Sequence, residues 1–389
     1  MTSRTDLACL MPLVLLAGCE LGAKQVEQTG YRGQGLEQIY DPDNFKQAGA
    51  IPPEPYPLPA DEGPRAREVY QNVQVLGDLS AERFNHLMAS ITAWVSPEQG
   101  CNYCHNPNNL ASDEVYTKNV ARRMLQMTRG INGRWSTHVQ ETGVTCYTCH
   151  RGQPVPQYIW AQEPMPDKFS VRGQKRGQNT PAANVGYASL PYSAFQRYLS
   201  GDPGSIRVAS DSPYPGRNSA TTRDAEDSYA IMMHTSKALG VNCTYCHNSQ
   251  SFRSWSLSRA QRATAWYGIR MVRDINFGYI QPLQGVFPAN RKGPMGDPYK
   301  VNCLTCHQNQ AKPLGGVSML AQYPYMRSPV AMQAAQPIGG AGNVPAVIDR
   351  PASMADRILP GDVPQQQGQA QPVGSRESTP PVPGATPAQ

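Results

Sequence analysis

The chain has 389 residues, among them 34 glycines, 36 prolines and 10 cysteines, and charged residues make up 16% of it. Its hydrophobic fraction of 39% lies below the ~45–50% that is usual for globular proteins. No run of about 18 apolar residues occurs, which excludes a polytopic membrane protein. The net charge of +6 is spread without a Lys/Arg block, so a nucleic-acid partner is not indicated. Such a chain needs a source of stability beyond an ordinary hydrophobic core.

The first residues have the features of an export signal. Residues 7–18 are apolar and lead into the tetrapeptide L-A-G-C, which ends at Cys19. A short apolar region that ends in small residues is typical of a cleaved signal, and the tetrapeptide resembles the bacterial lipoprotein box. We therefore expect a lipoprotein signal peptide over residues 1–18 and acylation of Cys19, since about twelve apolar residues are too few to span a membrane. Cys9, with no apolar region before it, is a weaker candidate for the lipid anchor.

Four segments have the apolar spacing of amphipathic helices. They cover residues 81–95, 114–129, 224–239 and 259–275. Ser80 is a suitable N-cap for the first, Gly240 is a stop signal for the third, and Ser258 with Gln261 fits a capping box for the fourth. Before them, residues 19–63 are rich in proline, which favours an extended N-terminal segment.

Eight of the ten cysteines belong to four copies of the pattern C-x-x-C-H, the attachment signature of a c-type haem. Two thiols at this spacing add to the two vinyl groups on one porphyrin edge, and the histidine that follows reaches the iron. A zinc knuckle or a redox C-x-x-C does not require that histidine, and a chance match is expected only about 0.005 times in such a chain. The sequence thus predicts four covalently attached c-type haems with their irons. The residues are Cys101, Cys104 and His105; Cys146, Cys149 and His150; Cys243, Cys246 and His247; and Cys303, Cys306 and His307.

The motifs fall into two similar pairs, which indicates an internal duplication. The segment that ends at Asn132 in the first half parallels the one that ends at Asn276 in the second. We expect a mainly α-helical fold with much irregular structure and little or no sheet: a multihaem cytochrome c with two pseudo-equivalent two-haem halves. The expected parts are the signal peptide 1–18, the extended segment 19–63, the first half 64–160, a connecting segment 161–222, the second half 223–326 and a disordered tail rich in Pro, Gln and Gly over 327–389.

The second axial ligand of each iron decides whether it transfers electrons or stays open for chemistry. The candidates are three histidines and six helix-face methionines: His86, His138, His234, Met88, Met124, Met127, Met232, Met233 and Met271. Such methionines otherwise fill gaps in a core. Alignment of the halves on their shared asparagine places Gly268 opposite Met124, so the second half lacks one methionine. His138 is free to supply that ligand, and Met271 is the runner-up.

The lipoprotein box, the four motifs at these intervals and the methionine-bearing helices resemble the tetrahaem cytochrome c subunit of the purple-bacterial photosynthetic reaction centre. The resemblance covers roughly residues 19–326. In that family three haems have Met/His ligation and the fourth has two histidines. Carried onto this chain, it implies Met88, Met124 and Met232 as ligands of the first three irons and His138 as a ligand of the fourth.

Two alternatives for these ligands stay open. Met233 is a close rival of Met232, because adjacent residues differ by only about 100° around a helix. His86 and His234 each sit beside a better-placed methionine, so we expect them to be packed or surface side chains.

The resemblance implies an electron carrier rather than an enzyme. It would take electrons from a soluble periplasmic cytochrome c or high-potential iron–sulfur protein and re-reduce the photo-oxidised special pair. The haems would lie in the order first, second, fourth, third. The implied partners are the reaction-centre membrane subunits, and the implied location is the periplasmic face of the bacterial inner (photosynthetic) membrane, with Cys19 as the lipid anchor.

Two further hypotheses follow from the residues. A periplasmic multihaem oxidoreductase with one open iron, such as a nitrogen-oxide or peroxide reductase, is the alternative function. Asp78, Glu82 and Glu98 near the first motif could steer a basic donor, although solvated carboxylates at a helix start are an equal explanation.

Overall fold

The computed structural model describes residues 25–28, 37–40, 51–164, 190–191, 194–200, 206, 208 and 220–327. The expected signal peptide, Cys19, most of the connecting segment and the tail from residue 328 lie outside these ranges. By its internal contacts the chain divides into two units, residues 1–357 and 358–389, and all described residues belong to the first.

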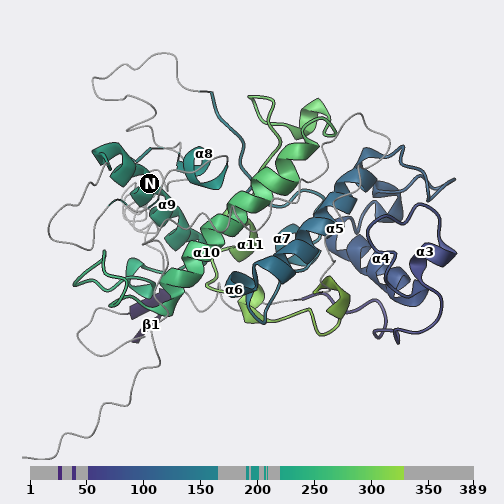
Figure 1. Ribbon diagram of the computed structural model, residues 1–389, viewed down its shortest axis with the longest axis horizontal. Helices are drawn as coiled ribbons and strands as arrows, with labels where there is room; N and C mark the ends of the chain where they lie inside the picture. Colours follow the sequence, from purple (N-terminus) through teal and green to yellow (C-terminus); the bar gives the residue numbers. More distant parts are fainter. Residues whose placement is uncertain are drawn as a thin grey trace, which may run out of the picture. The chain divides into compact units, whose positions relative to one another are not determined.

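The described part is mainly helical, with long irregular stretches between the helices (Figure 1). Its sheet consists of two antiparallel strands, β1 (Gln25–Gln28) and β2 (Glu37–Tyr40), with Gln25 opposite Tyr40. The helices are α3 (Ala66–Val69), α4 (Ala81–Val95), η1 (Gly100–Tyr103), α5 (Tyr116–Arg134), α6 (Ser136–Val139), α7 (Cys146–His150), α8 (Ala194–Leu199), α9 (Thr222–Leu239), η4 (Cys243–Tyr245) and α10 (Ala260–Asp274). Five short turns and one more helix follow: η5 (Ile275–Ile280), η6 (Gln281–Leu283), η7 (Ala289–Arg291), α11 (Cys303–His307), η8 (Pro313–Gly316) and η9 (Pro324–Met326). The predictions of a mainly helical chain and little sheet are confirmed.

Helices α4 and α9 begin and end where the sequence signals indicate. Ser80 caps α4, with its hydroxyl accepting a hydrogen bond from the backbone N–H of Arg83. Helix α9 ends at Gly240, whose φ of 64° is the left-handed conformation that glycine adopts without strain. No helix within the described ranges is long and apolar enough to cross a membrane.

Helix α10 begins one residue later than the capping-box prediction requires. Its N-cap is Arg259, and the prediction that Ser258 fills this role is wrong. The Ser258 hydroxyl instead donates to the carbonyl of Ser254 and accepts a hydrogen bond from Arg262. A serine with closer partners on both sides is not free to cap the helix.

Helix α5 extends to Arg134 rather than ending near residue 129. Two glycines in its last turns do not stop it. Gly130 gives the phenol of Tyr279 room to approach, because a Cβ at residue 130 would clash with that hydroxyl. The last turns of α5 are thus in direct contact with Tyr279 from the second half of the chain.

The buried apolar residues form two clusters. One gathers around α8, α9, α10 and the end of α5, with Ile231, Ile269 and Val272 among its members. The other surrounds α4 and the segment 314–326, with Trp94, Leu125 and Tyr323 inside it. The chain therefore returns near its described end to pack against α4.

Candidate haem-attachment sites

The four C-x-x-C-H motifs adopt two local structures. The first motif starts in η1 and the third in η4, and both are tight 3-10 turns. The second and fourth form the short helices α7 and α11, and each is followed by a residue in left-handed conformation, Arg151 at φ 50° and Gln308 at φ 48°. The first motif is therefore the structural counterpart of the third, and the second of the fourth.

A backbone carbonyl holds the imidazole of every motif histidine. The Nδ1···O distances are 2.9 Å for His105 to Leu110 and His247 to Phe252, and 2.8 Å for His150 to Gln153 and His307 to Gln310. A carbonyl only accepts, so Nδ1 carries the hydrogen and Nε2 keeps its lone pair. This tautomer and this partner are typical of metal-ligating histidines.

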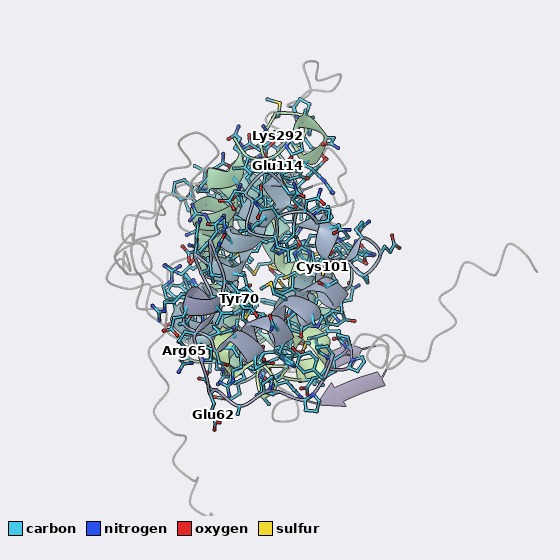
Figure 2. All side chains as sticks on the ribbon, turned by 90° about the vertical axis from the view of Figure 1, so that its right-hand side faces the viewer. Glu62, Arg65, Tyr70, Cys101, Glu114 and Lys292 are labelled. Carbon is cyan, nitrogen blue, oxygen red and sulfur yellow. The ribbon has the colours of Figure 1, made fainter. Side chains whose placement is uncertain are left out.

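The eight motif cysteines form no disulfide, and of these Cys101 and Cys243 are exposed (Figure 2 labels Cys101). Burial raises the pKa of the Cys146 thiol to about 12, so it stays protonated at neutral pH. The Sγ atoms of Cys149 and Cys306 lie 2.9 Å apart, and α7 and α11 are neighbours in Figure 1. The second and fourth motifs thus adjoin each other through their second cysteines.

Two asparagines anchor the second and fourth motifs in the same way. The side-chain amide of Asn132 donates to the carbonyl of Val144 at 2.8 Å and accepts from its N–H at 2.8 Å. Asn276 makes the same pair of bonds with Val301, at 2.8 and 2.9 Å. Each valine stands two residues before the first cysteine of its motif. The asparagines on which the sequence halves were aligned are structural equivalents.

His138 lies beside the fourth motif, although in the sequence it stands shortly before the second motif. Its ring centre is 6.1 Å from that of His307, and its Nδ1 is 2.8 Å from the carbonyl oxygen of Thr264 on α10. That bond again leaves Nε2 with its lone pair. A metal bonded to both Nε2 atoms at about 2 Å places two imidazole centres about 6 Å apart. The residues therefore fit one iron between the two rings.

Gly268 makes the space that His138 occupies. A Cβ at residue 268 would lie 2.5 Å from Cε1 of His138, closer than real side chains approach. Burial lowers the pKa of the His138 imidazole, and burial together with the repulsion that a protonated His138 would exert lowers the pKa of His307 to about 4. Both rings are thus neutral at pH 7, the state in which a histidine binds a metal.

The methionine candidates occupy different surroundings. Met88 on α4 packs against the cluster that also contacts Cys146, and Met124 and Met232 pack against the cluster around α9 and α10. Met271 is only 5% exposed within that second cluster. Met88 thus belongs to one apolar cluster, and Met124, Met232 and Met271 belong to the other.

His86 and His234 are packed side chains, as expected. His86 is fully buried with both ring nitrogens hydrogen-bonded, and His234 packs edge-on against Phe195 at 4.4 Å between ring centres. Of the three carboxylates near the first motif, Asp78 binds Arg129 through both oxygens, at 3.2 and 2.7 Å. Asp78 is therefore committed to Arg129 and is not a free docking charge.

Sequence reasoning missed the backbone partners of the site. The carbonyls that orient the motif histidines come five residues after the histidine in motifs one and three and three residues after it in motifs two and four. The spacing is the same within each pair of similar motifs, so the internal duplication could have indicated these partners. Contacts between the halves, such as the hydrogen bond from Arg291 to Tyr103, could not be predicted from the sequence. Figure 2 labels Lys292, the residue next to Arg291.

Two cysteines followed at once by a histidine whose Nδ1 is bonded to a backbone carbonyl are the attachment pattern of the c-type cytochromes, which carry covalently bound haem. Residues 20–327 match the family described as photosynthetic reaction centre cytochrome C subunit. The chain belongs to this family. Its known members are electron carriers rather than enzymes, so the hypothesis of an oxidoreductase is not supported.

Two of the following three relatives carry the same description, and the third is named as another cytochrome c. The photosynthetic reaction center cytochrome c subunit of Thermochromatium tepidum is 47% identical over 87% of this chain and 83% of its own length. That of Rubrivivax gelatinosus is 48% identical over 83% of this chain and 89% of its own length. Cytochrome c-554 of Chloroflexus aurantiacus is 28% identical over 64% of this chain and 70% of its own length.

Proposed function

We propose that the chain binds four c-type haems and relays electrons through them to the photo-oxidised special pair of a photosynthetic reaction centre. The observation that carries the proposal is the common geometry of the four motifs: two thiols and one histidine whose Nδ1 is tied to a backbone carbonyl. Each bound haem supplies reversible one-electron chemistry at its iron. At each motif the two cysteines would hold the group by thioether bonds, and the imidazole of the following histidine would bind its iron.

The proposed sixth ligands are Met88, Met124 and Met232 for the first three irons and His138 for the fourth. The spacing of His138 and His307 and the space at Gly268 support the last of these. A thioether ligand raises the reduction potential and a second imidazole lowers it. The fourth site is therefore expected to have a lower potential than Met/His sites in comparable surroundings.

The proposal includes two pseudo-equivalent halves with two haems each. The matching bonds of Asn132 and Asn276 support it, as do the paired local structures of the motifs. The contact between Cys149 and Cys306 puts the second and fourth sites next to each other, which agrees with a haem order of first, second, fourth, third.

The proposed location is the periplasmic face of the inner membrane, with acylated Cys19 as the anchor. The relatives are named as reaction center subunits, which supports association of this chain with reaction-centre membrane subunits. The electron donor would be a soluble periplasmic cytochrome c or a high-potential iron–sulfur protein. Thioether attachment of haem takes place outside the cytoplasm and is consistent with an exported chain.

A flash experiment tests the role. In isolated membranes, a saturating flash is expected to oxidise a haem of this protein within microseconds, seen as bleaching of its α-band. Mass spectrometry of the purified chain is expected to show the added mass of four haems. A chain with four haems that shows no light-induced α-band change would refute the photosynthetic role while keeping the haem assignment.

A further inference from the structure

Five rings form a series of contacts beside α4. The distances between ring centres are 4.6 Å from Trp94 to Tyr323, 5.1 Å from Tyr323 to His86, 6.1 Å from Tyr323 to Tyr325 and 5.0 Å from His86 to Tyr56. All lie in the range of about 4.5–7 Å in which aromatic rings contact each other directly. The electron carriers of the proposed function do not use these rings.

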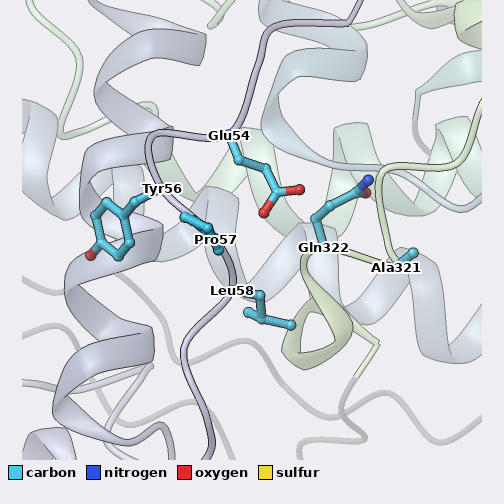
Figure 3. A pocket seen from close by; sticks show the side chains of 6 residues that line it. All are labelled: Glu54, Tyr56, Pro57, Leu58, Ala321 and Gln322. Carbon is cyan, nitrogen blue, oxygen red and sulfur yellow. The ribbon is translucent and has the colours of Figure 1, made fainter.

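The series joins the interior to the surface. At its inner end Trp94 is 1% exposed, and its carbonyl accepts a hydrogen bond from Gly152 just after the second motif. The same buried cluster contacts Cys146. At the outer end Tyr56 is 38% exposed and, with Glu54, lines an open pocket of about 480 Å³ (Figure 3).

The hydrogen bonds of His86 settle its tautomer. Nε2 lies 3.0 Å from the carbonyl oxygen of Tyr56, which only accepts, so Nε2 carries the hydrogen. Nδ1 is then a bare acceptor, and the hydroxyl of Tyr325, 3.1 Å away, donates to it. This distance is within the reach required for direct proton transfer.

Tyr325 differs in this respect from its neighbour Tyr323. The Ser90 hydroxyl lies 2.8 Å from the carbonyl of His86 and 3.0 Å from the Tyr323 hydroxyl. Ser90 is the donor in the contact with Tyr323, so the Tyr323 hydroxyl accepts there from an alcohol, which is no base. Burial raises the pKa of Tyr325, so its phenol is neutral and must lose a proton when it loses an electron.

We propose that Tyr325 is a proton-coupled oxidation site and that Trp94 and Tyr323 lead oxidising equivalents to it from the interior. Tyr325 gives one electron to a strong one-electron oxidant of the class that peroxide generates. Its O–H bond breaks, and the proton forms an N–H bond at Nδ1 of His86, leaving a neutral tyrosyl radical and an imidazolium. The Glu54 carboxylate, 3.8 Å from Nε2, faces that positive charge.

The proton transfer needs no rearrangement, because Tyr325 already donates to Nδ1 of His86 and the His86 tautomer leaves that nitrogen free to accept the proton. The step would let the protein move a damaging oxidation from the interior around Trp94 to Tyr325, where it stays until an external reductant returns the electron. The inference concerns the side chains alone, so it holds or fails independently of the photosynthetic role.

The test uses the haem-loaded full chain with its irons held in the ferric state. Flash-generated tris(bipyridine)ruthenium(III) is the oxidant, and freeze-quenched samples are examined by electron paramagnetic resonance with ring-deuterated tyrosine. We expect a long-lived tyrosyl signal that falls at least threefold in Tyr325→Phe. Tyr229→Phe, the same change at a tyrosine that is 56% exposed outside the series, is expected to leave the long-lived signal unchanged.

Two measurements on other forms keep the proposal testable if Tyr325→Phe is unstable. Radical formation in the unmodified protein is expected to be about two- to threefold slower in D₂O, because a proton moves with the electron. Trp94→Phe, which keeps an aromatic ring but removes the oxidisable indole, is expected to slow the appearance of the signal. A full long-lived signal in a folded Tyr325→Phe, or equal rates in H₂O and D₂O, would overturn the proposal.

Discussion

Replacement of Gly268 by alanine probes the fit between α10 and His138. The new Cβ would lie 2.5 Å from Cε1, 2.9 Å from Nδ1 and 3.2 Å from Nε2 of His138. The ring cannot stay in place at these distances. It must move away from Thr264, whose carbonyl it binds, and change its position relative to His307.

The expected cost follows from two opposing terms. Overpacking a filled site costs about 1–3 kcal/mol, while alanine in a helix interior gains about 1 kcal/mol over glycine. The net loss in unfolding free energy is thus about 0–2 kcal/mol. Gly133→Ala on α5 is the matched control, because a Cβ there meets nothing within 4 Å, and it is expected to gain up to about 1 kcal/mol.

Denaturant unfolding and redox titration of the haem-loaded protein measure the two effects. We expect Gly268→Ala to lower the unfolding free energy by about 1–3 kcal/mol relative to Gly133→Ala. We also expect it to shift the midpoint potential of the haem with two histidines, because one imidazole is displaced. If the two variants match in both stability and potentials, His138 does not occupy the space above Gly268 as a ligand.

Three further predictions concern charges and the anchor. Asp78→Ala removes the partner of the buried Arg129 guanidinium and is expected to lower the unfolding free energy by about 1–2 kcal/mol. Hydrogen bonds from Thr221 and from a nearby arginine lower the pKa of Asp224, in the first turn of α9, to about 2. The ionised Asp224 carboxylate is expected to stabilise the fold by about 1 kcal/mol, as a helix cap does. Because its pKa is lowered in the folded state, this stabilisation is complete above pH 4 and is lost as the pH falls towards 2. Cys19→Ser is expected to release the haem-loaded chain from membranes, as seen by fractionation.

Each of these has its own control and contrary outcome. For Asp78 the control is Glu82→Ala, an exposed carboxylate in the first turn of α4, and equal losses would show that Arg129 gains nothing from its partner. Asp224→Asn is expected to flatten the acid limb of the stability profile between pH 4 and 2; an unchanged limb would contradict the capping role. Cys9→Ser serves as the control for the anchor, and release by that variant instead would reassign the acylated cysteine.

Local signals in the sequence were sufficient where one short segment decides the outcome. Ser80 at the start of α4 and Gly240 at the end of α9 act as caps because their partners lie within a few residues. The prediction for Ser258 is wrong because neighbours on both sides compete for its hydroxyl. The alignment of Asn132 with Asn276 is confirmed because both asparagines bond the backbone of the valine two residues before a motif, and the same role requires the same residue.

The sequence by itself determined the chemistry of the sites, since two thiols and an imidazole at C-x-x-C-H spacing suit one cofactor edge and one metal. Only the tertiary structure decided that Cys149 meets Cys306 and that the ring series runs from Trp94 to Tyr56. That His138 lies beside His307 agrees with the assignment made from the sequence. The physical reason is that the local signals act over a few residues. Contacts between residues more than a hundred positions apart depend on how the helices pack, and a single sequence does not record that packing.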